Sequence, residues 1–210
     1  MTSIVEAGAE ALIPPRRGGV KALRAAAAGC QACPLWRNAT QTVFGAGPAR
    51  APVLLIGEQP GDREDREGQP FVGPAGHLLE AALEKAGLDA RRTYRTNAVK
   101  HFKWKPRGKR RIHQRPSKLE IEACKPWLEA ELDRVRPEIV GILGAVAAES
   151  LIGGDFRVTK RRGELVEVDF APVAVPTIHP SAVLRARDSD ERAVEFDKLV
   201  DDLRVIARNV

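Results

Sequence analysis

The feature that most constrains the fold is an apolar run at residues 52–57, PVLLIG, that leads directly into a Gly- and Pro-rich segment. A near-continuous apolar run of this length is typical of a strand buried on both faces of a parallel sheet. We expect three further strands at residues 93–99, 138–143 and 173–178. Segments with the apolar spacing of helices separate these strands. The sequence therefore predicts an α/β fold with three layers, in which helices cover both faces of a central, four-stranded, mainly parallel sheet.

The segments between the strands carry helix signals. The pattern SKLE at residues 117–120 is a capping box, and the apolar stripe behind it runs to Val135. We expect helices at residues 20–29, 75–86, 117–135, 145–152 and 190–207, and a β-hairpin at residues 158–168 that turns near Arg162 and Gly163. One core can be built from 210 residues of which 43% are apolar. We therefore expect a single domain at residues 20–210, preceded by a flexible tail at residues 1–19.

The cysteines and the hydropathy pattern indicate the setting of the chain. No apolar run reaches the length that spans a membrane, and the first residues lack the order of a signal peptide. The three cysteines are an odd number, and two of them form the pair Cys30-x-x-Cys33. Without an export signal, this pattern favours a metal site over a disulfide framework. We expect a monomeric protein of a bacterial cytoplasm.

The positive charge of the chain is concentrated in one stretch. Nine of the 34 Lys and Arg residues lie between residues 100 and 118, where there is no Asp or Glu, while the whole chain has a net charge of +6. A local cationic segment indicates a polyanion such as DNA. Trp104 can stack on a base or pack the segment down. The residues expected to contact phosphate are Lys103, Lys105, Arg107, Lys109, Arg110 and Arg111.

Unusual residues follow three of the predicted strands. GEQPG at residues 57–61 follows the first strand, Asn97 lies near the end of the second, and His179-Pro180-Ser181 follows the fourth. Ligands of such folds bind outside the carboxyl ends of the strands. These segments should therefore meet at one edge of the sheet.

Three motifs together resemble a known family. GEQPGDREDREGQPFVGPAG at residues 57–76, TNAVK at residues 96–100 and HPSAV at residues 179–183 resemble the signatures of the iron–sulfur uracil-DNA glycosylases. GEQPG together with the inserted KRRIH at residues 109–113 resembles the UdgX branch of that family. The resemblance implies an enzyme that excises uracil from DNA, preferably single-stranded, and then stays covalently attached to the sugar C1′ through His113.

The resemblance also implies roles for single residues. Phe71 stacks on the extruded base, the Asn97 amide reads the uracil edge, and His179 donates to uracil O2 as negative charge develops there. Glu58 stabilises the sugar cation. Taken singly, a core Phe, a turn Asn and a turn His are the commoner situations. The implied uracil-binding residues are Gly57, Gln59, Asp62, Phe71, Asn97 and His179, and the implied catalytic residues are Glu58, His113 and His179.

A second set of residues suits a metal. By ligand type alone, three Cys and one His fit structural zinc at least as well as an iron–sulfur cluster. Cys124 also lies on the apolar stripe of its helix, as an inert buried thiol would. The resemblance implies a structural [4Fe–4S] cluster held by Cys30, Cys33, His101 and Cys124, with His101 at a position where the family carries Cys.

The segment after His179 is expected to touch DNA. Val183 or Leu184 can push into the gap that the flipped base leaves, although packing of a helix start on the core explains them nearly as well. The expected contacts are Ser181, Leu184 and Arg185.

Two alternatives to covalent capture remain open from the sequence. In the first, the protein is a conventional turnover glycosylase and His113 only grips phosphate. In the second, it is a metal-stabilised DNA-binding module without excision, which leaves Glu58, Asn97 and His179 unexplained.

Overall fold

A computed structural model describes residues 14–210, so the predicted tail at residues 1–19 lies mostly outside the described residues. The main sheet has the order β2-β1-β5-β7-β6. Its parallel strands are β1 (Val53–Gly57), β2 (Thr93–Asn97), β5 (Ile139–Leu143) and β7 (Ala171–Thr177), and β6 (Val166–Val168) pairs antiparallel with β7. In the part of the chain that the structure describes, no helix is long and apolar enough to cross a membrane.

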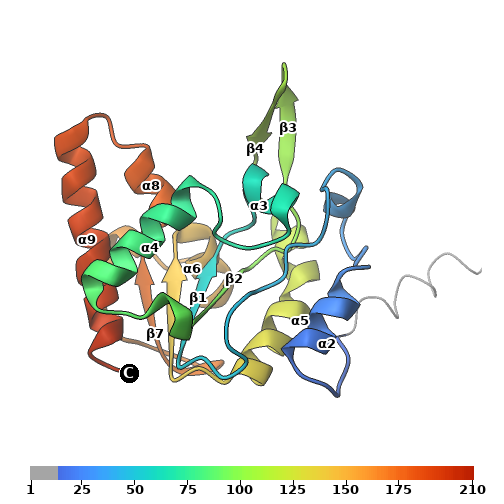
Figure 1. Ribbon diagram of the computed structural model, residues 1–210, viewed down its shortest axis with the longest axis horizontal. Coiled ribbons are helices and arrows are strands. Elements are labelled where there is room, and N and C mark those ends of the chain that lie inside the picture. The colour runs from blue at the N-terminus through green and yellow to red at the C-terminus, as the bar shows by residue number, and fades with distance from the viewer. Residues whose placement is uncertain (1–13) are drawn as a thin grey trace, which may run out of the picture.

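Two layers of helices cover the sheet, as Figure 1 shows. β1 sends Leu54 and Ile56 into one core, and Val53 and Leu55 into the other. The first core is covered by α2 (Val20–Ala27), α5 (Lys118–Val135) and α6 (Ala145–Leu151), and the second by α4 (Pro74–Ala86), α8 (Pro180–Leu184) and α9 (Ser189–Ala207). The predicted three-layer α/β/α fold is therefore confirmed. Shorter helical segments are η1 (Pro34–Arg37), α3 (Asp62–Glu67), η2 (Ala90–Arg92) and α7 (Val158–Arg161).

The sheet differs from the prediction in its strand number. It has five strands rather than four, because β6 extends its edge beside β7. The predicted hairpin at residues 158–168 was wrong: residues 158–161 form α7, and β6 pairs with the strand that follows it. Only residues 166–168 of the predicted hairpin form a strand, and its partner is the edge of β7, which is otherwise open.

The basic stretch at residues 100–118 contains a hairpin of its own. β3 (Trp104–Arg107) pairs with β4 (Arg110–His113), and Trp104 lies opposite His113. The hairpin stands above the carboxyl edge of the main sheet in Figure 1. Its last residue, His113, is thereby brought back to the end of β1.

Candidate active site

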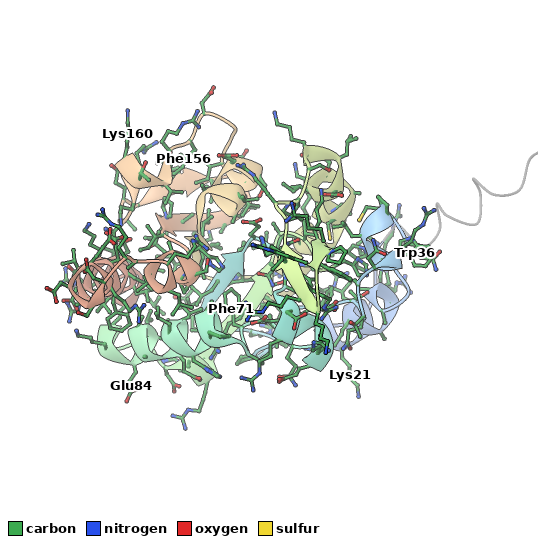
Figure 2. All side chains as sticks on the ribbon, turned by 90° about the horizontal axis from the view of Figure 1, so that it is seen from above. Lys21, Trp36, Phe71, Glu84, Phe156 and Lys160 are labelled. Atoms are coloured by element: carbon green, nitrogen blue, oxygen red, sulfur yellow. The ribbon has the colours of Figure 1, made fainter. Side chains whose placement is uncertain are left out.

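A cavity of about 670 Å³ opens at the carboxyl edge of the parallel strands. Figure 2 looks down on this edge, with Phe71 labelled near its middle. The cavity unites segments that are far apart in the chain, as predicted from the strand ends. The predicted site residues that line it are Glu58, Gln59, Phe71, Asn97, His113, Ser181, His179 and Arg185.

Because Gly57 has no side chain, three of these side chains can approach its Cα closely. A Cβ at Gly57 would overlap with Asn97 Oδ1, and would lie 2.9 Å from Phe71 Cζ and 3.5 Å from His179 Nε2. Gly57 and Asn97 are neighbours across β1 and β2. The strand pairing thus sets the amide of Asn97 beside a position that only glycine can occupy.

Phe71 is held in an unusual backbone conformation. Its φ of 58° lies in the left-handed region, which a bulky residue rarely adopts. Gly76 makes this possible, since any Cβ there would overlap with the Phe71 carbonyl. The Phe71 ring lies 6.3 Å from the His179 ring with an angle of 27° between the two planes. The strained loop presents a flat apolar surface to the cavity.

The hydrogen bonds of His179 define its tautomer. Its Nδ1 accepts the backbone N–H of Ser181 at 3.1 Å, as the N-cap of α8. Because Nδ1 is an acceptor, the proton of the neutral ring is assigned to Nε2, the atom nearest Gly57. Burial, followed by repulsion from Arg185 and His113, lowers the pKa of His179 to about 4. At neutral pH the ring is therefore an uncharged donor into the cavity.

A buried ion pair lies beneath Asn97. Lys100 Nζ donates to the Asn97 carbonyl at 2.6 Å, to Thr96 Oγ1 at 2.8 Å and to Glu131 Oε2 at 2.5 Å. The side chains of Lys100 and Glu131 are 1% and 0% exposed. Sequence reasoning missed this pair, although Glu131 lies on the same face of α5 as Cys124, seven residues later. The pair fixes the strand end that carries Asn97.

Glu58 and His113 are neighbours in the lining of the cavity. Glu58 Oε1 lies 3.8 Å from His113 Nε2, and this buried oxygen has no hydrogen-bond partner within residues 14–210. Burial raises the pKa of Glu58, an effect that Arg115 and Arg185 partly offset. Burial and the Arg185 cation lower the pKa of His113. An unpaired acceptor thus lies near a neutral imidazole.

The hairpin is tied to the site by Gln59. Gln59 Oε1 accepts the Lys103 N–H at 3.0 Å, and its Nε2 donates to the Gln114 carbonyl at 2.9 Å. Both stems of the hairpin are therefore joined to the residue that follows Glu58. The resemblance implied that Gln59 binds uracil; Gln59 does line the cavity, but its side chain is engaged by the two stems of the hairpin.

Arg111 is turned inward rather than toward solvent. Its guanidinium bonds to Asp62 and to Asp65 Oδ2, at 2.6 Å for the latter, and lies 5.4 Å from the ring centroids of both Phe102 and Trp104. Only 12% of the Arg111 side chain is exposed. Asp62, expected at uracil, is found at this contact and does not line the cavity.

The other basic residues in and beside the hairpin differ in whether an acidic side chain pairs with them. Lys103 Nζ pairs with Glu120 Oε2 at 2.8 Å. Among the described residues, no ionic partner is found for the exposed side chains of Lys105, Arg107, Lys109 and Arg110.

Val183 and Leu184, the two residues considered for insertion into the gap left by the flipped base, differ in exposure. Val183 is fully buried in the core, whereas Leu184 is 36% exposed. Arg185 Nη1 donates to Ser181 Oγ at 3.0 Å, so the segment after His179 is internally braced. Of the two apolar side chains, only Leu184 is available to DNA.

Cys30, Cys33, Cys124 and His101 lie on the α2 and α5 side of the site. All three cysteines are free thiols. Burial raises the pKa of Cys33, and that of Cys124 to about 12, and the neighbouring thiols add to both shifts, as expected of sulfurs gathered in one region. Among the described residues, no three His, Cys, Asp or Glu side chains are close enough to hold a single ion. Cysteine thiolates are the usual ligands of an iron–sulfur cluster and histidine replaces some of them in certain centres, so the donor types of these four residues suit a cluster.

Comparisons with known proteins agree with this geometry. The family described as the uracil DNA glycosylase superfamily matches residues 44–204. The type-4 uracil-DNA glycosylase of Thermotoga maritima is 34% identical over 171 residues, which cover 81% of this chain and 85% of that protein. The type-4 enzyme of Sulfurisphaera tokodaii is 36% identical over 163 residues, covering 74% and 71%. The type-4 enzyme of Archaeoglobus fulgidus is 34% identical over 178 residues, covering 81% and 86%.

Proposed function

The chain belongs to the uracil-DNA glycosylase superfamily, and from this premise we propose that it excises uracil from DNA and then captures the resulting sugar through His113, as in the UdgX branch. The uracil-DNA glycosylase activity is supported by the type-4 relatives. The capture step is supported by one observation in particular. His113, carried on the inserted hairpin, reaches the cavity with its Nε2 only 3.8 Å from the unpaired oxygen of Glu58.

The excision step uses the groups that surround Gly57. Uracil stacks on Phe71, and the Asn97 amide donates to O4 and accepts from N3–H. Cytosine presents the opposite pattern at both positions, so a site built for uracil rejects it. As the bond from C1′ to N1 breaks, its electron pair leaves with the base. The Nε2–H of neutral His179 donates to O2, where the negative charge accumulates.

The capture step balances without water. Glycosidic bond cleavage leaves a cationic C1′, which the nearby Glu58 carboxylate stabilises. The unprotonated ring nitrogen of neutral His113 attacks C1′ with its lone pair, and the proton of the other ring nitrogen is lost. The departing uracil anion takes up one proton. The products are free uracil and a bond from histidine to C1′. Neutrality of His113 is favoured by burial and by the Arg185 cation.

We also propose that Cys30, Cys33, His101 and Cys124 hold a [4Fe–4S] cluster. The cluster would link three segments of the chain and has a structural role. The hairpin lies between His101 and Cys124, so two of the ligands bracket it. Measurement of iron and acid-labile sulfide in the purified protein tests this set. A colourless protein that contains zinc instead would refute it.

A gel assay tests the proposed function. The protein is mixed with a single-stranded oligonucleotide that carries one uracil, heated in SDS and run under denaturing conditions. We expect a heat-stable shifted band that requires the uracil and disappears in His113→Ala. The matched control His77→Ala changes an exposed histidine that does not line the cavity, and should keep the band. If the wild-type protein releases uracil but forms no shifted band, it is a conventional turnover glycosylase. If it releases no uracil, it is a DNA-binding module without excision.

A further inference from the structure

The two ring nitrogens of His101 are in different situations. The His101 side chain is buried, and its Nε2 lies 2.9 Å from the hydroxyl oxygen of Thr42. Within residues 14–210, no hydrogen-bond partner is found for the other ring nitrogen, Nδ1. One nitrogen is therefore engaged by a neighbouring side chain, and the other is available to a ligand.

The second contact of the Thr42 hydroxyl decides which nitrogen carries the proton. Thr42 Oγ1 donates to the carbonyl oxygen of Ala27, the last residue of α2, at 3.0 Å. Two oxygens at this distance would repel each other if no proton lay between them. Because a hydroxyl has a single proton, Thr42 can only accept from His101. The proton of the neutral ring is thus assigned to Nε2, which leaves the lone pair on Nδ1.

The Ala27 carbonyl also joins His101 to the first cysteine of the Cys-x-x-Cys pair. Besides the Thr42 hydroxyl, this oxygen accepts the backbone N–H of Cys30 at 3.0 Å. A chain of three hydrogen bonds therefore runs from the His101 ring through Thr42 and the Ala27 carbonyl to Cys30. Rotation of the ring would break the first of these bonds.

Two of the cysteines accept hydrogen bonds through their sulfur atoms. The indole N–H of Trp127 donates to Cys30 Sγ at 3.2 Å, and the backbone N–H of Lys100 donates to Cys124 Sγ at 3.2 Å. The Trp127 donor comes from α5, which lies beside α2 in Figure 1. A donor aimed at a sulfur favours the thiolate over the thiol. These contacts therefore suit cysteines that bind a metal.

We propose that Thr42 orients His101 so that its Nδ1, and not its Nε2, binds the cluster. The proposal rests on the proposed [4Fe–4S] cluster and adds to it a ligating atom and a positioning residue. A metal-binding histidine usually donates its other ring N–H to a nearby acceptor, which fixes the tautomer and the orientation of the ring. Here that acceptor is a hydroxyl, which in turn donates to Ala27.

Selective isotope labelling identifies the ligating atom. The iron-loaded protein is prepared with histidine that carries ¹⁵N only at Nδ1 or only at Nε2. Its cluster is reduced by irradiation in liquid nitrogen, which works whatever the reduction potential of the cluster. Pulsed electron paramagnetic resonance then measures the coupling of each nitrogen to the electron spin of the cluster.

A nitrogen bound directly to the cluster couples strongly to its spin. We expect a strong coupling that changes with the label at Nδ1. A strong coupling that changes with the label at Nε2 would overturn the proposal, and so would the absence of any strong nitrogen coupling.

The rate at which an iron chelator removes the cluster tests Thr42 itself. Thr42→Val removes the hydroxyl and keeps the shape of the side chain, whereas Thr42→Ser keeps the hydroxyl. Loss of such a partner of a ligating histidine lowers metal affinity by about 10- to 100-fold. Thr42→Val should therefore lose its iron about tenfold faster than the wild type, or more, and Thr42→Ser should lose it at nearly the wild-type rate.

The matched control is Thr93→Val. The Thr93 hydroxyl donates to the Ala90 carbonyl at 2.7 Å, at the start of β2 and so at the end of that strand away from His101. This variant loses the same kind of hydrogen bond and should keep the wild-type rate of iron loss. Equal rates for the two valine variants would refute the role of Thr42.

The cluster and the glycosylase activity are tested separately from this inference. A purified protein without iron and acid-labile sulfide would overturn the cluster, and this inference with it. Uracil release from the oligonucleotide decides the glycosylase activity whichever atom of His101 is the ligand.

Discussion

Replacement of Lys100 by Met should destabilise the protein strongly through the buried ion pair under Asn97. The Lys100 ammonium makes three hydrogen bonds, and Glu131 is fully buried. The variant leaves the Glu131 carboxylate with its neutral donors, the Gly45 N–H at 2.9 Å and the Tyr94 hydroxyl at 2.8 Å among them, but without a countercharge. Removal of one partner of a buried pair costs about 3–5 kcal/mol.

The melting temperature measures this cost. At about 2–4 °C per kcal/mol for a chain of this size, Lys100→Met should melt roughly 6–20 °C below the wild type. The matched control is Lys85→Met, because the Lys85–Asp197 pair spans 2.8 Å with side chains 51% and 62% exposed. That control should cost no more than about 1 kcal/mol.

The double variant Lys100→Met/Glu131→Gln separates the pair from mere loss of packing. It removes both charges, so it should be more stable than Lys100→Met alone. Equal melting temperatures of Lys100→Met and Lys85→Met would refute the predicted cost, and so would a double variant that is less stable than Lys100→Met alone.

Three further predictions concern the site. Gly57→Ala places a methyl group against the amide of Asn97 and should lower kcat/KM for excision by about 10²-fold, with near wild-type kinetics as the contrary result. Capture needs neutral His113, whose pKa lies below its ordinary 6.5; its rate should therefore hold through neutral pH and decline only as the pH falls through that lowered pKa, whereas a decline between pH 8 and 6.5 would contradict the assignment. Arg111→Lys removes the two-pronged guanidinium contact to Asp62 and Asp65 that holds the hairpin in place. This contact is worth about 1.5 kcal/mol or more, so its loss should lower the capture rate about tenfold. The exposed Arg110→Lys should leave the capture rate unchanged, and equal effects of the two variants would refute the separate role of Arg111.

Much of the fold could be predicted because its signals are local. The run at residues 52–57 must be buried on both faces, and Gly57 and Asn97 end strands that the pattern places in one sheet. The edge strand β6 could not be assigned in this way, because its own residues do not specify which neighbour they pair with. The partner of β6 depends on which strand of the sheet has an unpaired edge, and this is set by the tertiary fold.

The candidate site, too, was predictable from the sequence only in part. Residue types and motif order in the sequence predicted that Glu58, Asn97, His113 and His179 meet at one site, and the structure places all four at one cavity. The sequence also showed that the positive charge is local. Only the tertiary structure decided which cations remain free for DNA. Arg111 and Arg110 are adjacent in sequence, yet one is sequestered by Asp65 and the other is exposed. The reason is physical: residue type fixes the charge and hydrogen-bonding capacity of a side chain, whereas its partners, burial and pKa depend on segments brought beside it by folding.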